Sequence, residues 1–181
     1  MPRRSLDPHF ENERPEWTER KHELLERTVI PSVEKMKLLG QLALVDGYAG
    51  PNEYGGAVQG STVIMVNATK RLRLKGHQAT VFACEPNQKR YQQLVRNLSN
   101  AVDSEILVVY NECHTDARPR ILQLIGGSPA FVFLDPHGPK DLRLQEDLLP
   151  WLRRPKTDVL GIFMGGDGPA LGGSLHGTRR V

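Results

Sequence analysis

Four apolar runs of this chain end in, or within two residues of, an acidic side chain. The acids are Asp46, Glu85, Glu112 and Asp135. A carboxylate can accept hydrogen bonds from hydroxyl or amine groups of a ligand, and it can neutralise a ligand's positive charge. Any one of them could be an ordinary loop residue, but parallel strands would bring all four acids to one edge of a sheet. The pattern therefore indicates a polar binding crevice at the carboxyl ends of the strands.

A loop rich in glycine and small residues follows the first of these runs. The run LALVD ends at Asp46, and the loop continues as GYAGP from Gly47 through Gly50 toward a helix-like segment near Ser61. A strand, a glycine-bearing turn and a helix let backbone N–H groups approach a bound cofactor closely. The alternative is an ordinary surface turn after a strand.

The spacing of these residues bears on the kind of cofactor. The loop lacks GxGxxG, and the 39 positions from Asp46 to Glu85 exceed the roughly 20 of a dinucleotide fingerprint. Both features disfavour a nicotinamide or flavin enzyme. An acid before the glycine loop suits a cofactor with a cationic amino-acid end, as in S-adenosylmethionine.

The fourth run ends in a stiffened corner, with Asp135 and Pro136 followed by a second proline at 139. A carboxylate held at the end of a buried strand is costly in a plain loop, and it is useful where it must stand beside reacting atoms. We therefore predict Asp135 and Pro136 as the catalytic corner. Glu85 is placed to accept the ribose hydroxyls, or alternatively to face the start of the next helix. Glu112 or Asp116 could meet an adenine ring, or be an exposed loop acid.

The elements that must position these acids alternate along the chain. We expect strands over 42–46, 78–85, 106–110, 130–134 and 158–164, and helices over 61–75, 87–98, around 121–124 and over 145–151. A further helix over 17–37 should be divided by Pro31. Its Lys21 and His22 are expected on the solvated face, unless the helix lies across the crevice and one of them reaches in. This order predicts an α/β fold: a Rossmann-like, doubly wound and mainly parallel sheet with helices on both faces.

Composition fits one domain and excludes few functions. The chain has 181 residues, with 39% hydrophobic and 25% charged residues. We expect a flexible arm over 1–16, the domain over 17–164 and a Gly-rich disordered tail over 165–181. Without a signal peptide or a membrane-spanning run, a cytoplasmic protein with no membrane contact is expected. The net charge of +3 permits nucleic-acid binding without arguing for it. Cys84 and Cys113 lack metal-site spacing, so we expect buried free thiols and no metal.

Several stretches together resemble the three-Cys-motif partner (TcmP) family of S-adenosylmethionine-dependent methyltransferase-like proteins. They are WTERKHELL, LVDGYAGPNEY, GS at Gly60–Ser61, FACEPN and FLDPHG, and the resemblance covers about 17–164. The DGYAGP loop is also similar to that of the J-type bacterial ribosomal RNA adenine methyltransferases. The resemblance implies a Rossmann-like methyltransferase fold, S-adenosylmethionine as cofactor and a three-Cys-motif protein as a partner.

Carried over by position, the resemblance assigns roles to individual residues. It puts Asp46, Gly47 and Gly50 at the methionine portion of the cofactor, Glu85 at its ribose and Glu112 near its adenine. It puts Asp135 where a carboxylate holds the acceptor amine in line with the methyl sulfonium. The function it implies is methyl transfer to an amine, with nucleic acid as the expected substrate.

The chain departs from the family pattern at two places. In the catalytic corner, His137 and Gly138 stand where a proline and an aromatic residue would be, so the ring that stacks on a flipped base is missing. The sheet is also expected to lack its last two strands, in a natural short form or a truncated one. Two rivals follow: a non-catalytic partner protein that keeps the fold, and a nucleotide-binding protein with another cofactor. The acid before the loop disfavours the second.

Overall fold

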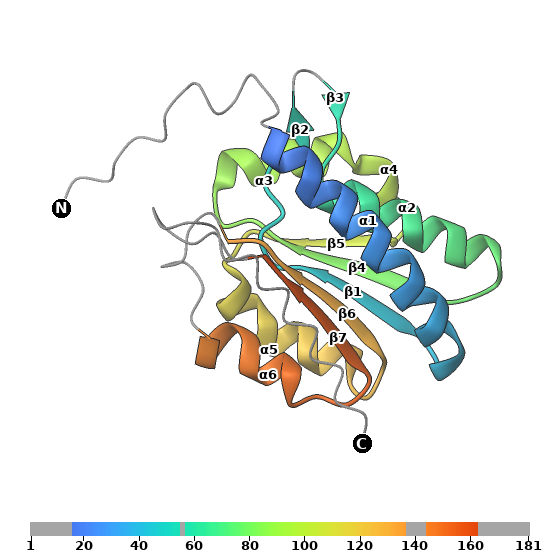
Figure 1. The fold of residues 1–181 in the computed structure, drawn as a ribbon. Coiled ribbons are helices and arrows are strands. Elements are labelled where there is room, and N and C mark those ends of the chain that lie inside the picture. The colour runs from blue at the N-terminus through green and yellow to red at the C-terminus, as the bar shows by residue number, and fades with distance from the viewer. Residues whose placement is uncertain (1–15, 55–56, 137–143, 163–181) are drawn as a thin grey trace.

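A five-stranded parallel sheet forms the centre of the chain in the computed structural model, which describes residues 16–54, 57–136 and 144–162 (Figure 1). The strands are β1 (Leu42–Asp46), β4 (Ala79–Cys84), β5 (Leu107–Tyr110), β6 (Ala130–Leu134) and β7 (Thr157–Gly161). They lie in the order β5-β4-β1-β6-β7, and every neighbouring pair is parallel. The order reverses between β1 and β6, which is the switch point where doubly wound folds bind ligands. The predicted α/β class with a Rossmann-like parallel sheet is confirmed.

Helices cover both faces of this sheet (Figure 1). One face carries α1 (Glu16–Met36), α2 (Ser61–Leu74), α3 (Gln88–Asn97) and α4 (Ser99–Asp103); the other carries α5 (His114–Ile125) and α6 (Leu149–Leu152). The remaining elements are a small hairpin of β2 (Glu53–Tyr54) and β3 (Ala57–Val58), a 3-10 turn, η2 (Lys37–Leu39), and a π-helical turn, η3 (Leu144–Leu148). The sequence did not predict the hairpin or α4 as separate elements.

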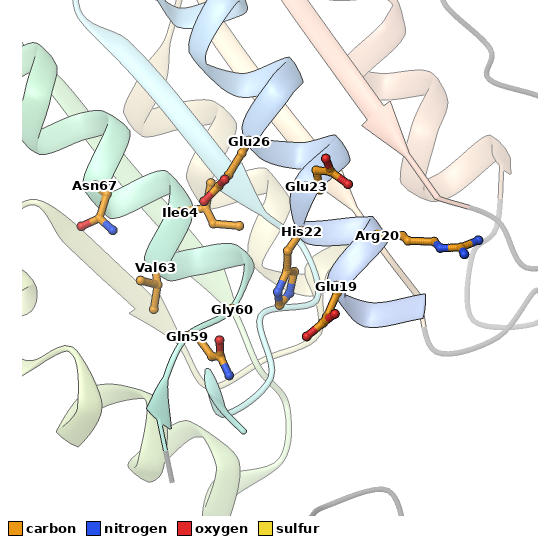
Figure 2. Close-up of a pocket in the computed structure, with 10 residues that line it drawn as sticks. All are labelled: Glu19, Arg20, His22, Glu23, Glu26, Gln59, Gly60, Val63, Ile64 and Asn67. Carbon is orange, nitrogen blue, oxygen red and sulfur yellow. The ribbon is translucent and has the colours of Figure 1, made fainter. Parts of the chain in front are cut away.

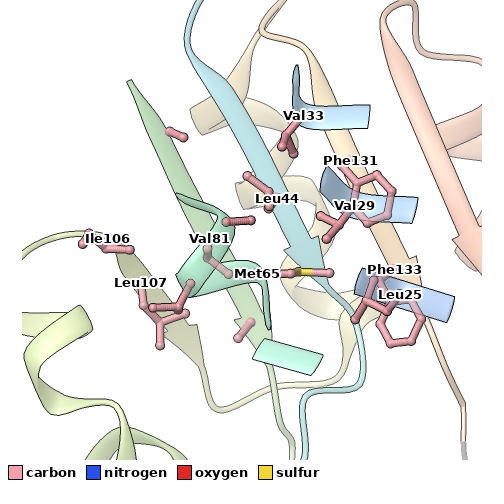
Figure 3. Close-up of a cluster of buried hydrophobic side chains, with 14 of the residues drawn as sticks. Leu25, Val29, Val33, Leu44, Met65, Val81, Ile106, Leu107, Phe131 and Phe133 are labelled. Atoms are coloured by element: carbon pink, nitrogen blue, oxygen red, sulfur yellow. The ribbon is translucent and has the colours of Figure 1, made fainter. Parts of the chain in front are cut away.

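The core explains why the central strands read as unbroken apolar runs. All five residues of β1 and of β6 are buried, because helices pack on both faces of these strands. On one face Leu25 and Val29 of α1 pack in a cluster with Phe131 and Phe133 (Figure 3). On the other face Trp151 of α6 belongs to a second cluster with α5 and the same strands. The rigid middle of the sheet therefore holds the strand ends in place.

The prediction that Pro31 divides the first helix is wrong. α1 runs without a break through Pro31, whose ring is exposed. A proline inside a helix costs roughly 3 kcal/mol. Val33 and Met36 continue the buried stripe beyond it, and burying each such side chain contributes about 1.5–3 kcal/mol. The helix continues because burial of these two side chains together outweighs the cost of the proline.

Some predictions fall wholly or partly outside the described residues. These are the Gly-rich tail, the arm except Glu16, the corner beyond Pro136 and the end of the fifth predicted strand. Within 16–54, 57–136 and 144–162, no helix is both long and apolar enough to cross a membrane.

Replacing Pro31 by alanine should stabilise the protein. Pro31→Ala restores a backbone N–H that can donate to the carbonyl of Arg27 within a continuous helix. We expect the free energy of unfolding to rise by about 2 kcal/mol, less than the full proline penalty because proline also restricts the unfolded chain. Urea denaturation measures this, with Lys35→Ala on the same helix as the control. An unchanged or lowered stability would show that α1 depends on the geometry imposed by proline.

Candidate active site at the carboxyl ends of the strands

Three carboxylates lie at the carboxyl ends of three neighbouring strands, with Glu85 and Asp135 two residues beyond the level of Asp46. Glu85 follows β4, Asp46 ends β1 and Asp135 follows β6, and these strands are adjacent in the sheet. The loop after β1 is tied to both neighbours: the N–H of Gly47 donates to the carbonyl of Phe133 in β6, and the N–H of Ala49 donates to that of Cys84 in β4, each at 3.0 Å. The expectation that parallel strands gather these acids at one edge is met in the structure.

Asp46 is fully buried at this edge. Its Oδ2 accepts a hydrogen bond from the Thr62 hydroxyl at 2.8 Å, and its Oδ1 faces the N–H of Tyr48 at 3.4 Å. Burial raises the pKa of Asp46 to about 6, hydrogen bonds from Ser61 and Thr62 oppose the shift, and the nearby charge of Asp135 adds to it. The carboxylate is held in place by hydrogen bonds, but no side chain supplies it with a cation in the part of the chain that the structure describes.

Asn52 holds the loop and the start of α2 together. Its side-chain N–H groups donate to the carbonyl of Ala49 at 2.7 Å and to the Thr62 hydroxyl at 3.0 Å. Its Oδ1 accepts from the N–H of Val63 at 3.2 Å, which caps α2 from a distance because Gly60 has no side chain. A Cβ on Gly60, whose φ is 154°, would lie 2.3 Å from that same oxygen. Asn52 was not identified from the sequence, although a polar residue between the loop and the helix was available as a signal.

The two predicted loop glycines take part in different ways. A Cβ on Gly47 would lie 2.6 Å from Leu134 and 3.2 Å from the ring of His114, so close packing requires glycine there. Gly50 has a φ of 65°, the left-handed region that favours glycine, and its missing Cβ faces no atom within 4 Å. Gly47 is therefore needed for packing beneath the loop, and Gly50 for the direction of the backbone.

Glu85 faces the start of the next helix, which is one of the two positions that the sequence allowed. It is buried, and its Oε1 accepts the N–H of Asn87, the cap residue of α3, at 2.7 Å. Asn111 at the end of β5 donates to the backbone carbonyl of Glu85 at 2.9 Å. The carboxylate is thus fixed between the helix start and the edge of the sheet, which fits a group that must present one oxygen to a ligand.

Asp135 forms an ion pair that reaches across 114 positions of sequence. Lys21 Nζ of α1 lies 2.5 Å from Asp135 Oδ2, and both side chains are 17% exposed. The expectation of a solvated Lys21 is therefore wrong, because Lys21 reaches a carboxylate at the carboxyl end of β6. His22 is also buried, at 9% exposure. The second oxygen, Asp135 Oδ1, is buried and has no hydrogen-bond partner among the described residues, and the buried Pro136 follows it.

Glu112 and Asp116 are engaged on the surface at the edge of β5. Glu112 pairs with Arg120, whose guanidinium lies 5.3 Å from the centre of the Tyr110 ring. Asp116 accepts a hydrogen bond from the Cys113 thiol at 2.9 Å. A ligand that used Glu112 would have to compete with an exposed arginine. Glu112 therefore stands apart from the three buried or half-buried carboxylates.

The two cysteines differ in environment. Cys84 is buried at the end of β4, and burial raises the pKa of its thiol far above the usual range, as expected for an inert core thiol. Cys113 is only partly buried, so the expectation of two buried thiols holds for Cys84 alone.

A buried polar cluster beneath the loop was missed from the sequence. Trp151 donates its indole N–H to His114 Nε2 at 2.9 Å, and His114 Nδ1 lies 3.5 Å from a carboxylate oxygen of Asp147. Burial lowers the pKa of His114 to about 4, so the ring is neutral at pH 7. Because His114 touches the space that a Gly47 side chain would need, the cluster supports the loop from below. Its members come from α5, η3 and α6, and no local motif connects them.

Comparison of the chain with models of known protein families finds no match, and comparison with curated proteins finds none either.

The buried Asp46 should make stability depend on pH. A folded-state pKa of about 6, against 3.8 for the unfolded group, means that the folded protein binds the proton more tightly. Asp46 therefore makes its full contribution to the free energy of unfolding below about pH 4. This contribution, about 2–3 kcal/mol, is lost as the pH rises through about 6. Asp46→Asn removes this dependence, so the stability of the wild type should fall relative to the variant between pH 4 and pH 8. Urea midpoints at several pH values measure the difference, and parallel profiles would contradict it.

Proposed function

We propose that this protein binds S-adenosylmethionine at the carboxyl ends of β4, β1 and β6 and transfers its methyl group to an amine. The observation that carries the proposal is the row formed by Glu85, Asp46 and Asp135 on three adjacent strands beside the switch point. Doubly wound folds bind ligands at that position. The row presents the groups that a cationic cofactor and an amine acceptor would need.

Asp46 supports a cofactor with a positively charged end. Its carboxylate is fully buried, and its pKa is raised because ionisation is unfavourable there. An ammonium group bound nearby would favour the ionised form and be attracted by it. Within this proposal, Asp46, Gly47 and Gly50 hold the methionine portion, Glu85 accepts the ribose hydroxyls, and Glu112 lies toward the adenine.

Asp135 supports an amine acceptor. Its Oδ1 is buried without a hydrogen-bond donor among the described residues, and its Oδ2 is bound by the ammonium of Lys21. An acceptor amine could donate its N–H to the unpartnered oxygen and present its lone pair to the cofactor. The bound cofactor supplies an electrophilic methyl group on a sulfonium. The protein's contribution is then to orient the amine, which is mainly catalysis by positioning.

The acceptor and the partner belong to the same proposal. The resemblance to the three-Cys-motif partner family makes nucleic acid the acceptor to test and a three-Cys-motif protein the partner to test. The ion pair between Lys21 and Asp135 also suits the rival role, a non-catalytic partner protein, since it occupies half of the corner without a ligand. Cofactor binding without methyl transfer to RNA, DNA or protein would favour that role.

Cofactor binding tests the first half of the proposal. Calorimetric titration of the folded protein with S-adenosylmethionine should give micromolar affinity, and Asp46→Asn and Glu85→Gln should each weaken it by about tenfold or more, the loss expected for a buried charged hydrogen bond. Glu53→Gln, in the β2–β3 hairpin, is the control with the same change of charge. No binding by a folded wild-type sample would overturn the proposal.

Methyl transfer tests the second half. Asp135→Asn should retain cofactor affinity within a few-fold but lower the transfer rate by about 10² or more, because it removes the acceptor's orienting carboxylate. Radiolabelled methyl transfer to pools of RNA, DNA and protein measures the rate. Equal loss of cofactor affinity and transfer would show that Asp135 supports the cofactor pocket and does not orient the acceptor.

A further inference from the structure

A cavity lies between α1 and the start of α2. Its volume is about 550 Å³, within the range of small-molecule sites. Gln59 and Gly60 form one end of its lining, and α1 and α2 form the walls (Figure 2). The sequence analysis and the proposed function assign nothing to this cavity.

The α1 wall presents one face of the helix. Glu19, His22 and Glu26 are spaced by three and four residues, so they lie on the same side, toward α2 (Figure 2). His22 is buried between the two exposed glutamates. Neither Glu19 nor Glu26 forms an ion pair with any residue in the described ranges. The wall therefore carries two separated negative charges that form no ion pair within the part of the chain that the structure describes.

The α2 wall is apolar in its middle and polar at its far end. Val63 and Ile64 are half-buried and face the cavity, and Asn67 lies one turn further along the same side of the helix. Together with Gln59 at the opposite end, this wall offers an aliphatic surface between two amide groups. Such a surface packs well against methylene groups and less well against a strongly hydrated ion.

The other charges at the cavity do not cancel the two glutamates. Arg20 points away from the side of α1 that faces α2 (Figure 2). Glu23 is bound by Arg27 at 2.6 Å, so that charge is neutralised within the helix. The chain as a whole carries a formal charge of +3, so attraction of a cation here has to come from the local groups.

We propose that this cavity binds a linear aliphatic polyamine, with its methylene chain against Val63 and Ile64 and its terminal ammonium groups at Glu19 and Glu26. Seven residues separate these glutamates, which places them about 10 Å apart along the helix axis at about 1.5 Å per residue. Extended spermidine can place a terminal ammonium beside each glutamate and carries one more positive charge than putrescine, whose two ammonium groups would have to lie between the glutamates. The site is independent of the proposed methyl transfer.

Titration with spermidine tests this site in the full chain. At low ionic strength, calorimetry should detect binding, and Glu19→Gln and Glu26→Gln should each weaken it by about threefold or more, with a larger loss in the double variant. Putrescine should bind more weakly than spermidine. Asp103→Asn, on α4 and away from the cavity, makes the same change of charge and should leave the affinity within about twofold.

Three results would overturn the proposal. They are no spermidine binding by folded protein, equal affinity for putrescine and spermidine, or a loss in Asp103→Asn as large as in Glu19→Gln, which would indicate diffuse charge attraction. A heteronuclear NMR titration locates the response. Shifts should concentrate on α1 and the start of α2, and shifts confined to other elements would also contradict the site.

Discussion

A buried carboxylate at the end of the central strand sets the local structure around the crevice. Asp46 cannot be left without hydrogen-bond donors in the interior, and Thr62 and the N–H of Tyr48 supply them. Thr62 is in turn held by Asn52, which has a left-handed backbone with a φ of 53°. The direction of the loop, the glycine before α2 and the start of that helix all follow from satisfying this one charge.

Helix α1 connects the core to the carboxyl ends of the strands. Its apolar side packs against the phenylalanines of β6, which fixes the height and rotation of the helix. That rotation places Lys21 against Asp135 and turns Glu19, His22 and Glu26 toward α2. Packing in the core therefore determines which polar groups of α1 lie at the strand ends and which face the cavity beside α2. A shift of α1 along the sheet would disturb both.

The sequence predicted the features that depend on local pattern. Unbroken apolar runs gave the central strands, because strands buried on both faces lack polar alternation, and the acids at their ends followed from the parallel topology. The continuity of α1 could not be predicted from the local sequence, because proline is a strong helix breaker. Its cost is outweighed by the packing of the helix against residues that are distant in sequence. Lys21 was expected in solvent because its partner, Asp135, lies 114 positions away. The cluster of His114, Asp147 and Trp151 was also missed, because its members come from three separate elements.

The negative charges at the carboxyl ends of β1 and β6 favour a cationic ligand. Asp46 and Asp135 are close enough for the charge of Asp135 to raise the pKa of Asp46, so the charge of Asp135 destabilises the ionised form of Asp46. Lys21 offsets the negative charge of Asp135 alone, and it contacts only one of the two carboxylate oxygens. A positive group entering between the strand ends would stabilise Asp46 in its ionised form and reduce this repulsion. Because Asp46 also holds the loop and α2, a cation bound there would stabilise the loop as well as the charge. A positive group bound at Asp46 would therefore also lie beside the end of β6, the neighbouring strand that carries Asp135.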